Sequence, residues 1–103
     1  MRYRDKQACQ IGCERELNEA AQRLESLRAS VHRFRYDLRS DWERRLDEVR
    51  GRHNRCIARL EALRRANPES WTPAAERAEE AFKTLREALA RVDEALSVRA
   101  LAA

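Results

Sequence analysis

Apolar residues recur every three or four positions along most of this chain, which is the spacing of one face of an α-helix. Upstream of residue 67 they form one stripe with His53 among them: Leu17, Ala20, Leu24, Leu27, Val31, Phe34, Leu38, Trp42, Leu46, Val49, His53, Cys56, Leu60 and Leu63. The steps alternate between three and four, as in a heptad seam, apart from two successive steps of four around Trp42. We therefore expect one helix over about residues 5–66.

A single polar break follows the stripe, with the sequence Asn67-Pro68-Glu69-Ser70-Trp71-Thr72-Pro73. Asn and Thr cap helices well, and a proline directly after a cap suits the first helical turn. We place the break at residues 67–72 and a second helix over about residues 73–100. Its own apolar stripe is Ala78, Phe82, Leu85, Leu89, Val92 and Leu96.

The two expected helices differ greatly in length, roughly 90 Å against 42 Å at 1.5 Å per residue. A hairpin would leave the stripe of residues 5–37 uncovered, so we expect a second chain to cover it. An antiparallel dimer in which paired residue numbers sum to about 69 would place Cys13 opposite Cys56 of the other chain. A parallel dimer or a trimer remains open, and a compact three-helix monomer would overturn the prediction.

The sequence thus predicts an all-α protein, with a long helix plus a shorter helix forming an antiparallel coiled-coil hairpin that assembles into a dimeric helical bundle. The 103 residues include only 2 Gly and 2 Pro, too few turn residues for a sandwich or barrel, and allow one domain. No apolar run is long enough for a membrane span, and no secretory signal is expected at the N-terminus. We expect a cytoplasmic protein with reduced thiols.

Three cysteines and one histidine are the candidate metal ligands. Cys9 and Cys13 lie four residues apart, and His53 and Cys56 lie three apart, spacings at which thiolate and imidazole bind zinc or copper. In one continuous helix the two pairs cannot meet, so a shared site would lie between chains. The alternatives are structural core residues and an interchain disulfide. No cofactor is expected.

Arginines and aromatic residues interleave in the middle of the long helix. Phe34 and Leu38 belong to the stripe, which leaves Arg33, Arg35, Tyr36 and Arg39 to contact nucleic acid. The net charge of +4, from 22 basic and 18 acidic residues, fits only weak affinity for polyanions. The interleaved acidic residues also fit a solvated face with ion pairs.

No catalytic motif is present: there is no phosphate-binding glycine loop, nucleophile elbow or HExxH pair, so we predict no enzymatic activity. The chain ends in Leu101-Ala102-Ala103, which resembles the end of the bacterial ribosome-rescue tag. This tail is a candidate degradation signal if it frays from the helix.

Part of the chain resembles a known group of proteins. The segments Trp42-Glu43-Arg44-Arg45-Leu46 and Ala58-Arg59-Leu60-Glu61-Ala62-Leu63 precede the break, and Trp71, Ala78-Glu79-Glu80-Ala81-Phe82 and Leu85 follow it. This arrangement is similar to small bacterial coiled-coil proteins, some of them labelled stress-response proteins and most uncharacterised. The resemblance implies a helical hairpin of bacterial origin and carries no catalytic or binding residues.

We therefore expect a non-enzymatic structural or protein-interaction coiled coil that binds itself as a homodimer and an unidentified partner protein. The process is unknown, and the resemblance implies a link to stress. Two alternatives stay open: a nucleic-acid-binding coiled coil that uses the Arg-rich face, and a thiol-based metal or redox sensor at an interchain cysteine site.

Overall fold

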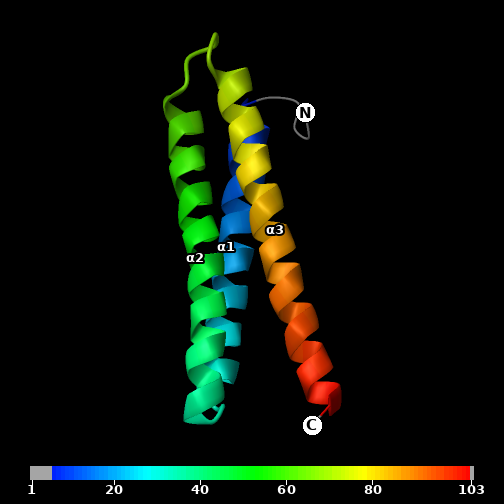
Figure 1. The fold of residues 1–103 in the computed structure, drawn as a ribbon. Helices are drawn as coiled ribbons and strands as arrows, with labels where there is room; N and C mark the ends of the chain where they lie inside the picture. The colour runs from blue at the N-terminus through cyan, green and yellow to red at the C-terminus, as the bar shows by residue number, and fades with distance from the viewer. Residues whose placement is uncertain (1–5, 103) are drawn as a thin grey trace.

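The protein is an elongated helical bundle, described by a computed structural model that covers the backbone of residues 6–102 and the side chains of residues 6–99. Within this range the chain forms three helices and no strand: α1 (Lys6–Val31), α2 (Tyr36–Arg65) and α3 (Trp71–Ala102). α2 runs opposite to α1, and α3 runs opposite to α2 (Figure 1). The bundle measures 52 × 20 × 17 Å. The predicted all-α class is confirmed.

The predicted unbroken helix over residues 5–66 is wrong, because the chain reverses direction at residues 32–35. His32 N–H still bonds to Arg28 carbonyl oxygen at 3.0 Å, as in an α-helix. Arg33 and Phe34 N–H then bond three residues back, at 3.2 and 3.0 Å, which tightens the chain out of the helix. α1 therefore ends at Val31, and the stripe of α1 folds onto α2 of the same chain.

Aromatic packing holds this turn. The rings of Phe34 and Trp42 meet edge to face, with centroids 6.0 Å apart and planes at 73°. The guanidinium of Arg99, near the end of α3, lies 4.6 Å from the centre of the Phe34 ring. Phe34 thus joins the turn to both α2 and α3, and such contacts contribute on the order of 1 kcal/mol each.

The second break, between α2 and α3, is formed by local hydrogen bonds. The Asn67 side-chain oxygen accepts the N–H groups of Glu69 at 3.1 Å and Ser70 at 2.9 Å. α3 begins at Trp71, so Pro73 lies within its first turn, where a missing N–H breaks no helical bond. The helix therefore starts two residues before the predicted position.

The core is built from the stripe residues of the three helices. Its buried residues are Cys9, Cys13, Ala20, Leu24, Leu27, Val31, Trp42, Leu46, Val49, Cys56, Leu60, Leu63, Ala74, Ala75, Ala78, Ala81, Phe82, Leu85, Ala88 and Val92. The face that α3 presents to the core is rich in alanine, whose short side chain allows close approach of the helix backbones. Leu17, Phe34, Leu38, Trp71, Leu89 and Leu96 are partly buried against this core. α2 is the central helix, packed on both of the others.

Charged contacts fasten α1 to its neighbours. Glu14 pairs with Arg64 of α2, and Arg23 pairs with Asp93 of α3. Lys6 donates from Nζ to the carbonyl oxygens of Arg64 at 3.2 Å and Ala66 at 2.7 Å. Among the described residues, none of the helices is both long enough and apolar enough to cross a membrane.

Truncation of a buried apolar side chain should lower the free energy of unfolding far more than truncation of an exposed one. Phe82 is 2% exposed, so Phe82→Ala should lower the free energy of unfolding by about 3–5 kcal/mol through lost burial and a cavity. Val98 is 60% exposed, so Val98→Ala should change it by less than about 0.5 kcal/mol. Urea unfolding followed by circular dichroism measures both, and equal losses would contradict the packing.

Candidate functional site: a groove between α1 and α2

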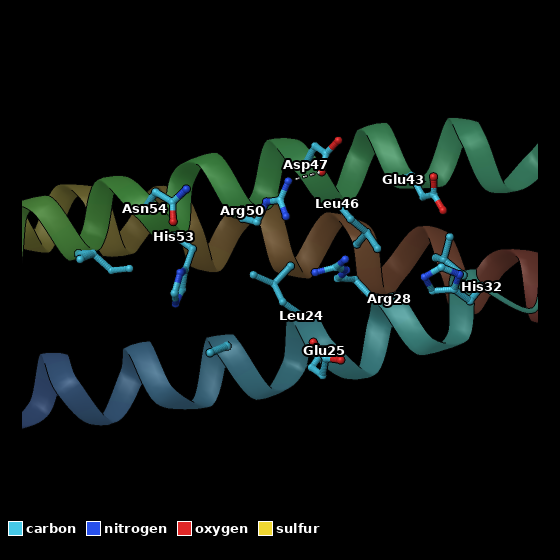
Figure 2. Close-up of a pocket in the computed structure, with 13 residues that line it drawn as sticks. Leu24, Glu25, Arg28, His32, Glu43, Leu46, Asp47, Arg50, His53 and Asn54 are labelled. Carbon is cyan, nitrogen blue, oxygen red and sulfur yellow. Dashed lines mark hydrogen bonds and ion pairs between the residues drawn. The ribbon is translucent and has the colours of Figure 1, made fainter.

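An open groove runs between α1 and α2 on the side away from α3, with a volume of about 410 Å³ (Figure 2). α3 lies behind the pair in this view. The groove is lined by Ala21, Leu24, Glu25, Arg28, Val31, His32, Glu43, Leu46, Asp47, Arg50, His53, Asn54 and Ile57. It is the side of the α1–α2 pair that no third helix covers within the described chain.

The groove has an apolar floor and charged edges. Leu24 of α1 and Leu46 of α2 point toward each other between the helices and are almost fully buried (Figure 2). Ile57 extends the apolar surface at one end and keeps 48% of its area exposed. The large apolar side chain that stays exposed at the groove is therefore Ile57, because the two leucines are already covered by folding.

The edges carry charges of both signs. Glu25 and Arg28 come from α1, and Glu43, Asp47 and Arg50 come from α2. Arg50 Nη2 lies 3.0 Å from Asp47 Oδ1, an i,i+3 pair on an exposed helix face. A mixed edge of this kind suits a helix whose own flanks carry Glu and Arg, and it disfavours a polyanion.

His53 closes one end of the groove. Its Nε2 lies 3.2 Å from the carbonyl oxygen of Leu17, so the half-buried ring links α2 to the backbone of α1. The imidazole was predicted within the stripe and lies there, at the junction between core and groove. Its partner is a main-chain oxygen, which suits a structural role better than metal binding.

The three cysteines lie in one core, and the prediction that they can approach only between chains is wrong. The reversal at residues 32–35 brings α1, with Cys9 and Cys13, against α2, with Cys56, in the same molecule. All three are buried, and no disulfide joins them. Within residues 6–99, His, Cys, Asp and Glu form no group of three or more that could hold a metal ion.

Burial raises the pKa of two of these thiols, Cys9 and Cys56. Removal from water, followed by the charge of Glu16, raises the pKa of Cys56 to about 11 despite the opposing charges of Arg86 and Arg55. Burial likewise raises the pKa of Cys9, opposed by a hydrogen bond with Cys13. The thiolate is the form that binds metal or attacks a disulfide, so Cys9 and Cys56 pack at neutral pH as small apolar side chains.

The basic residues predicted to contact nucleic acid gather at the turn and the first turn of α2. Arg33, Arg35 and Tyr36 are exposed, Tyr36 with 80% of its surface accessible. The Arg39 guanidinium lies 5.5 Å from the centre of the Tyr36 ring, and its Nε lies 3.7 Å from Glu43. Arg39 is therefore held by groups of its own helix.

The candidate degradation signal falls at the edge of the described chain. α3 extends through Leu101 and Ala102, which places their backbone within the helix. Ala103 and the side chains of the last residues lie outside the described residues.

The groove itself was not predicted from the sequence, although Leu24 and Leu46 were identified as stripe residues. Ile57 sits directly after a stripe position and reads as an isolated surface residue. An isoleucine outside the stripe was the one feature of the sequence that pointed to the groove. It indicates a groove only when α1 is known to lie beside α2 in the same molecule.

The raised pKa of Cys56 predicts a loss of stability at alkaline pH. The unfolded thiol ionises near pH 9 and the folded thiol near pH 11, so the contribution of the neutral thiol is complete below pH 9 and lost between pH 9 and 11. Over this window the free energy of unfolding should fall by roughly 2 kcal/mol more in the wild type than in Cys56→Ala. Urea unfolding at each pH tests this, and parallel slopes for the two proteins would contradict it.

Comparisons with known proteins add no relative from which a function can be transferred. No protein-family model matches this chain, and neither a curated protein nor a solved structure does. The assignment of function therefore rests on the groove, the thiols and the basic turn.

Proposed function

We propose that the protein is a non-enzymatic interaction module that binds an amphipathic helix of a partner protein in the α1–α2 groove. The observation that carries this proposal is an open groove between two packed helices, with charged edges and exposed Ile57 at one end. A helix in a groove anchors itself through apolar residues spaced three and four apart. A fourth helix here would complete a four-helix arrangement.

The charges at the edges favour a particular kind of partner. Glu25, Glu43 and Asp47 alternate with Arg28 and Arg50 around the floor. A partner helix with a Leu- or Ala-rich stripe and flanking residues of both signs would match them, much as the helices of this chain match each other. We place the protein in a reducing, cytoplasmic setting because its three thiols are unbridged. A link to stress rests on the sequence resemblance alone.

Site-specific photo-crosslinking tests the proposal in the cells that produce the protein. A photoreactive residue in place of Ile57 should capture a defined helical segment of one partner, and the same residue in place of Val98 on α3 should not. Val98 is the matched control because it is equally apolar and exposed. Capture at both positions alike, or at neither, would contradict the proposal.

The captured segment, made as a peptide, then allows a quantitative test. Ile57→Glu should weaken its binding at least about tenfold, since burying an isoleucine contributes roughly 1.5–3 kcal/mol. Val98→Glu should leave the affinity unchanged. Titration calorimetry measures both, with circular dichroism to check folding, and equal affinities for the two variants would contradict binding at the groove.

A second candidate function, nucleic-acid binding, is favoured by one observation: Arg33, Arg35 and Tyr36 are all exposed within four consecutive residues at the turn between α1 and α2. If it holds, affinity for a DNA or RNA fragment should fall steeply between about 50 and 200 mM salt. Arg33→Ala with Arg35→Ala should weaken binding and flatten the salt dependence. Arg44→Ala, at an exposed site on α2, is the control. Binding that is absent or insensitive to salt would exclude this function.

A further inference from the structure

None of the residues in the turn between α1 and α2 is of a type that favours a turn. Residues 32–35 are His, Arg, Phe and Arg, without Gly, Pro or Asn. Among the described residues no backbone φ is positive, so every residue of the turn has access to the helical region. The loop between α2 and α3 differs, because Asn67 and Pro68 favour a break there. The first turn is thus kept by two local backbone hydrogen bonds and by the packing of Phe34, and not by the residue types in it.

The apolar stripe passes through this turn without a change of rhythm. Val31, Phe34 and Leu38 follow one another in steps of three and four, and all three are wholly or partly buried. If residues 32–35 became helical, α1 and α2 would fuse into one helix over residues 6–65, about 90 Å long. The apolar stripe would stay on one face of the fused helix, and half of this stripe would be uncovered.

The packing of α1 on α2 is symmetric about the turn. His53 lies opposite Leu17, and Lys6 reaches the carbonyl oxygens of Arg64 and Ala66. In these contacts the two residue numbers sum to about 70, so the centre of symmetry falls near residue 35. A second copy of the fused helix, placed antiparallel, would offer each position the same neighbour that it has in the monomer.

We infer that the partner suited to the opened chain is a second copy, and that the protein forms a domain-swapped dimer. The turn straightens in both copies, and α1 of each copy packs on α2 of the other. The α1–α2 contacts are all reused, so exchange loses only the contacts of the turn and the freedom of two separate molecules, and it gains helical hydrogen bonds at residues 32–35.

The geometry of the exchange also defines the surface of the dimer. A twofold axis that exchanges two antiparallel helices is perpendicular to the plane that contains both. It therefore leaves both copies of α3 behind this plane and both α1–α2 grooves in front. Each groove is rebuilt with Leu24 from one copy and Leu46 from the other.

A substitution at Arg35 separates the two forms. In the monomer Arg35 has φ −60° and ψ 151°, which proline adopts without strain. In the fused helix a proline at this position loses a hydrogen bond and clashes with the preceding turn. Arg35→Pro in two copies should weaken dimerisation about ten-thousand-fold. Arg35→Ala also removes the charge but permits the helix, so it should dimerise like the wild type.

Light scattering after refolding over a series of protein concentrations gives the oligomeric state, and an intrachain distance identifies the exchange. Spin labels attached through noncanonical residues at positions 18 and 54 lie on neighbouring helices in the monomer. In the fused helix they lie about 54 Å apart. The doubly labelled protein is diluted into unlabelled protein before refolding, so that only distances within one chain are measured.

A wild-type dimer with the long distance, together with a monomeric Arg35→Pro protein, would establish the exchange. A wild type that remains monomeric at every concentration would overturn it. A dimer with the short distance would overturn it as well, because the copies would then associate through their surfaces. If Arg35→Pro fails to fold, the distance in the wild-type dimer decides between these outcomes.

Discussion

The apolar stripe of α1 must be covered by an apolar stripe on α2, and the rest of the structure follows from this pairing. Packing of an apolar face, rather than helix propensity, supplies most of the stability of a helix in a protein. The reversal at residues 32–35 allows the chain to supply both stripes itself. α3 then packs its alanine-rich face against the pair, and its Arg99 closes over Phe34 at the turn. The core that results contains all three cysteines, and burial in it raises the pKa of Cys9 and Cys56.

The same pairing explains why a groove exists. Two packed helices have two sides, and α3 covers one of them. The other keeps Leu24 and Leu46 at its floor and leaves Ile57 half exposed, with charges of both signs around it. The proposed partner helix would cover the surface that the chain leaves exposed at the groove. The proposed exchange between copies would use the stripe that α1 and α2 cover for each other in the monomer.

Much of the fold could be predicted from the sequence, because helical periodicity identifies which residues are buried. The all-α class, the stripe residues and the break after α2 were accessible in this way, the last through Asn67 and Pro68. The reversal at residues 32–35 was not, because His32 through Arg35 carry no turn signal and the hydrogen bonds of the turn depend on packing around Phe34. The pairing with a sum near 69 was expected between two chains, and the structure has nearly the same register within one. A stripe specifies which residues pair, but not which chain provides them. The groove could not be predicted because it exists only where α1 lies beside α2 in the same molecule.

The contact at Lys6 has a consequence for sequence variation at the far end of the bundle. Its ammonium group bonds to main-chain oxygens of residues 64 and 66, where the carbonyl ends of α2 carry partial negative charge. The fastening does not depend on which side chains occupy those two positions, since every residue presents the same carbonyl group. Replacements at Arg64 or Ala66 therefore leave the anchor in place, whereas loss of the single amine at residue 6 removes it. Replacement of Arg64 would still remove its separate ion pair with Glu14, so the two links between α1 and the end of α2 respond to different substitutions.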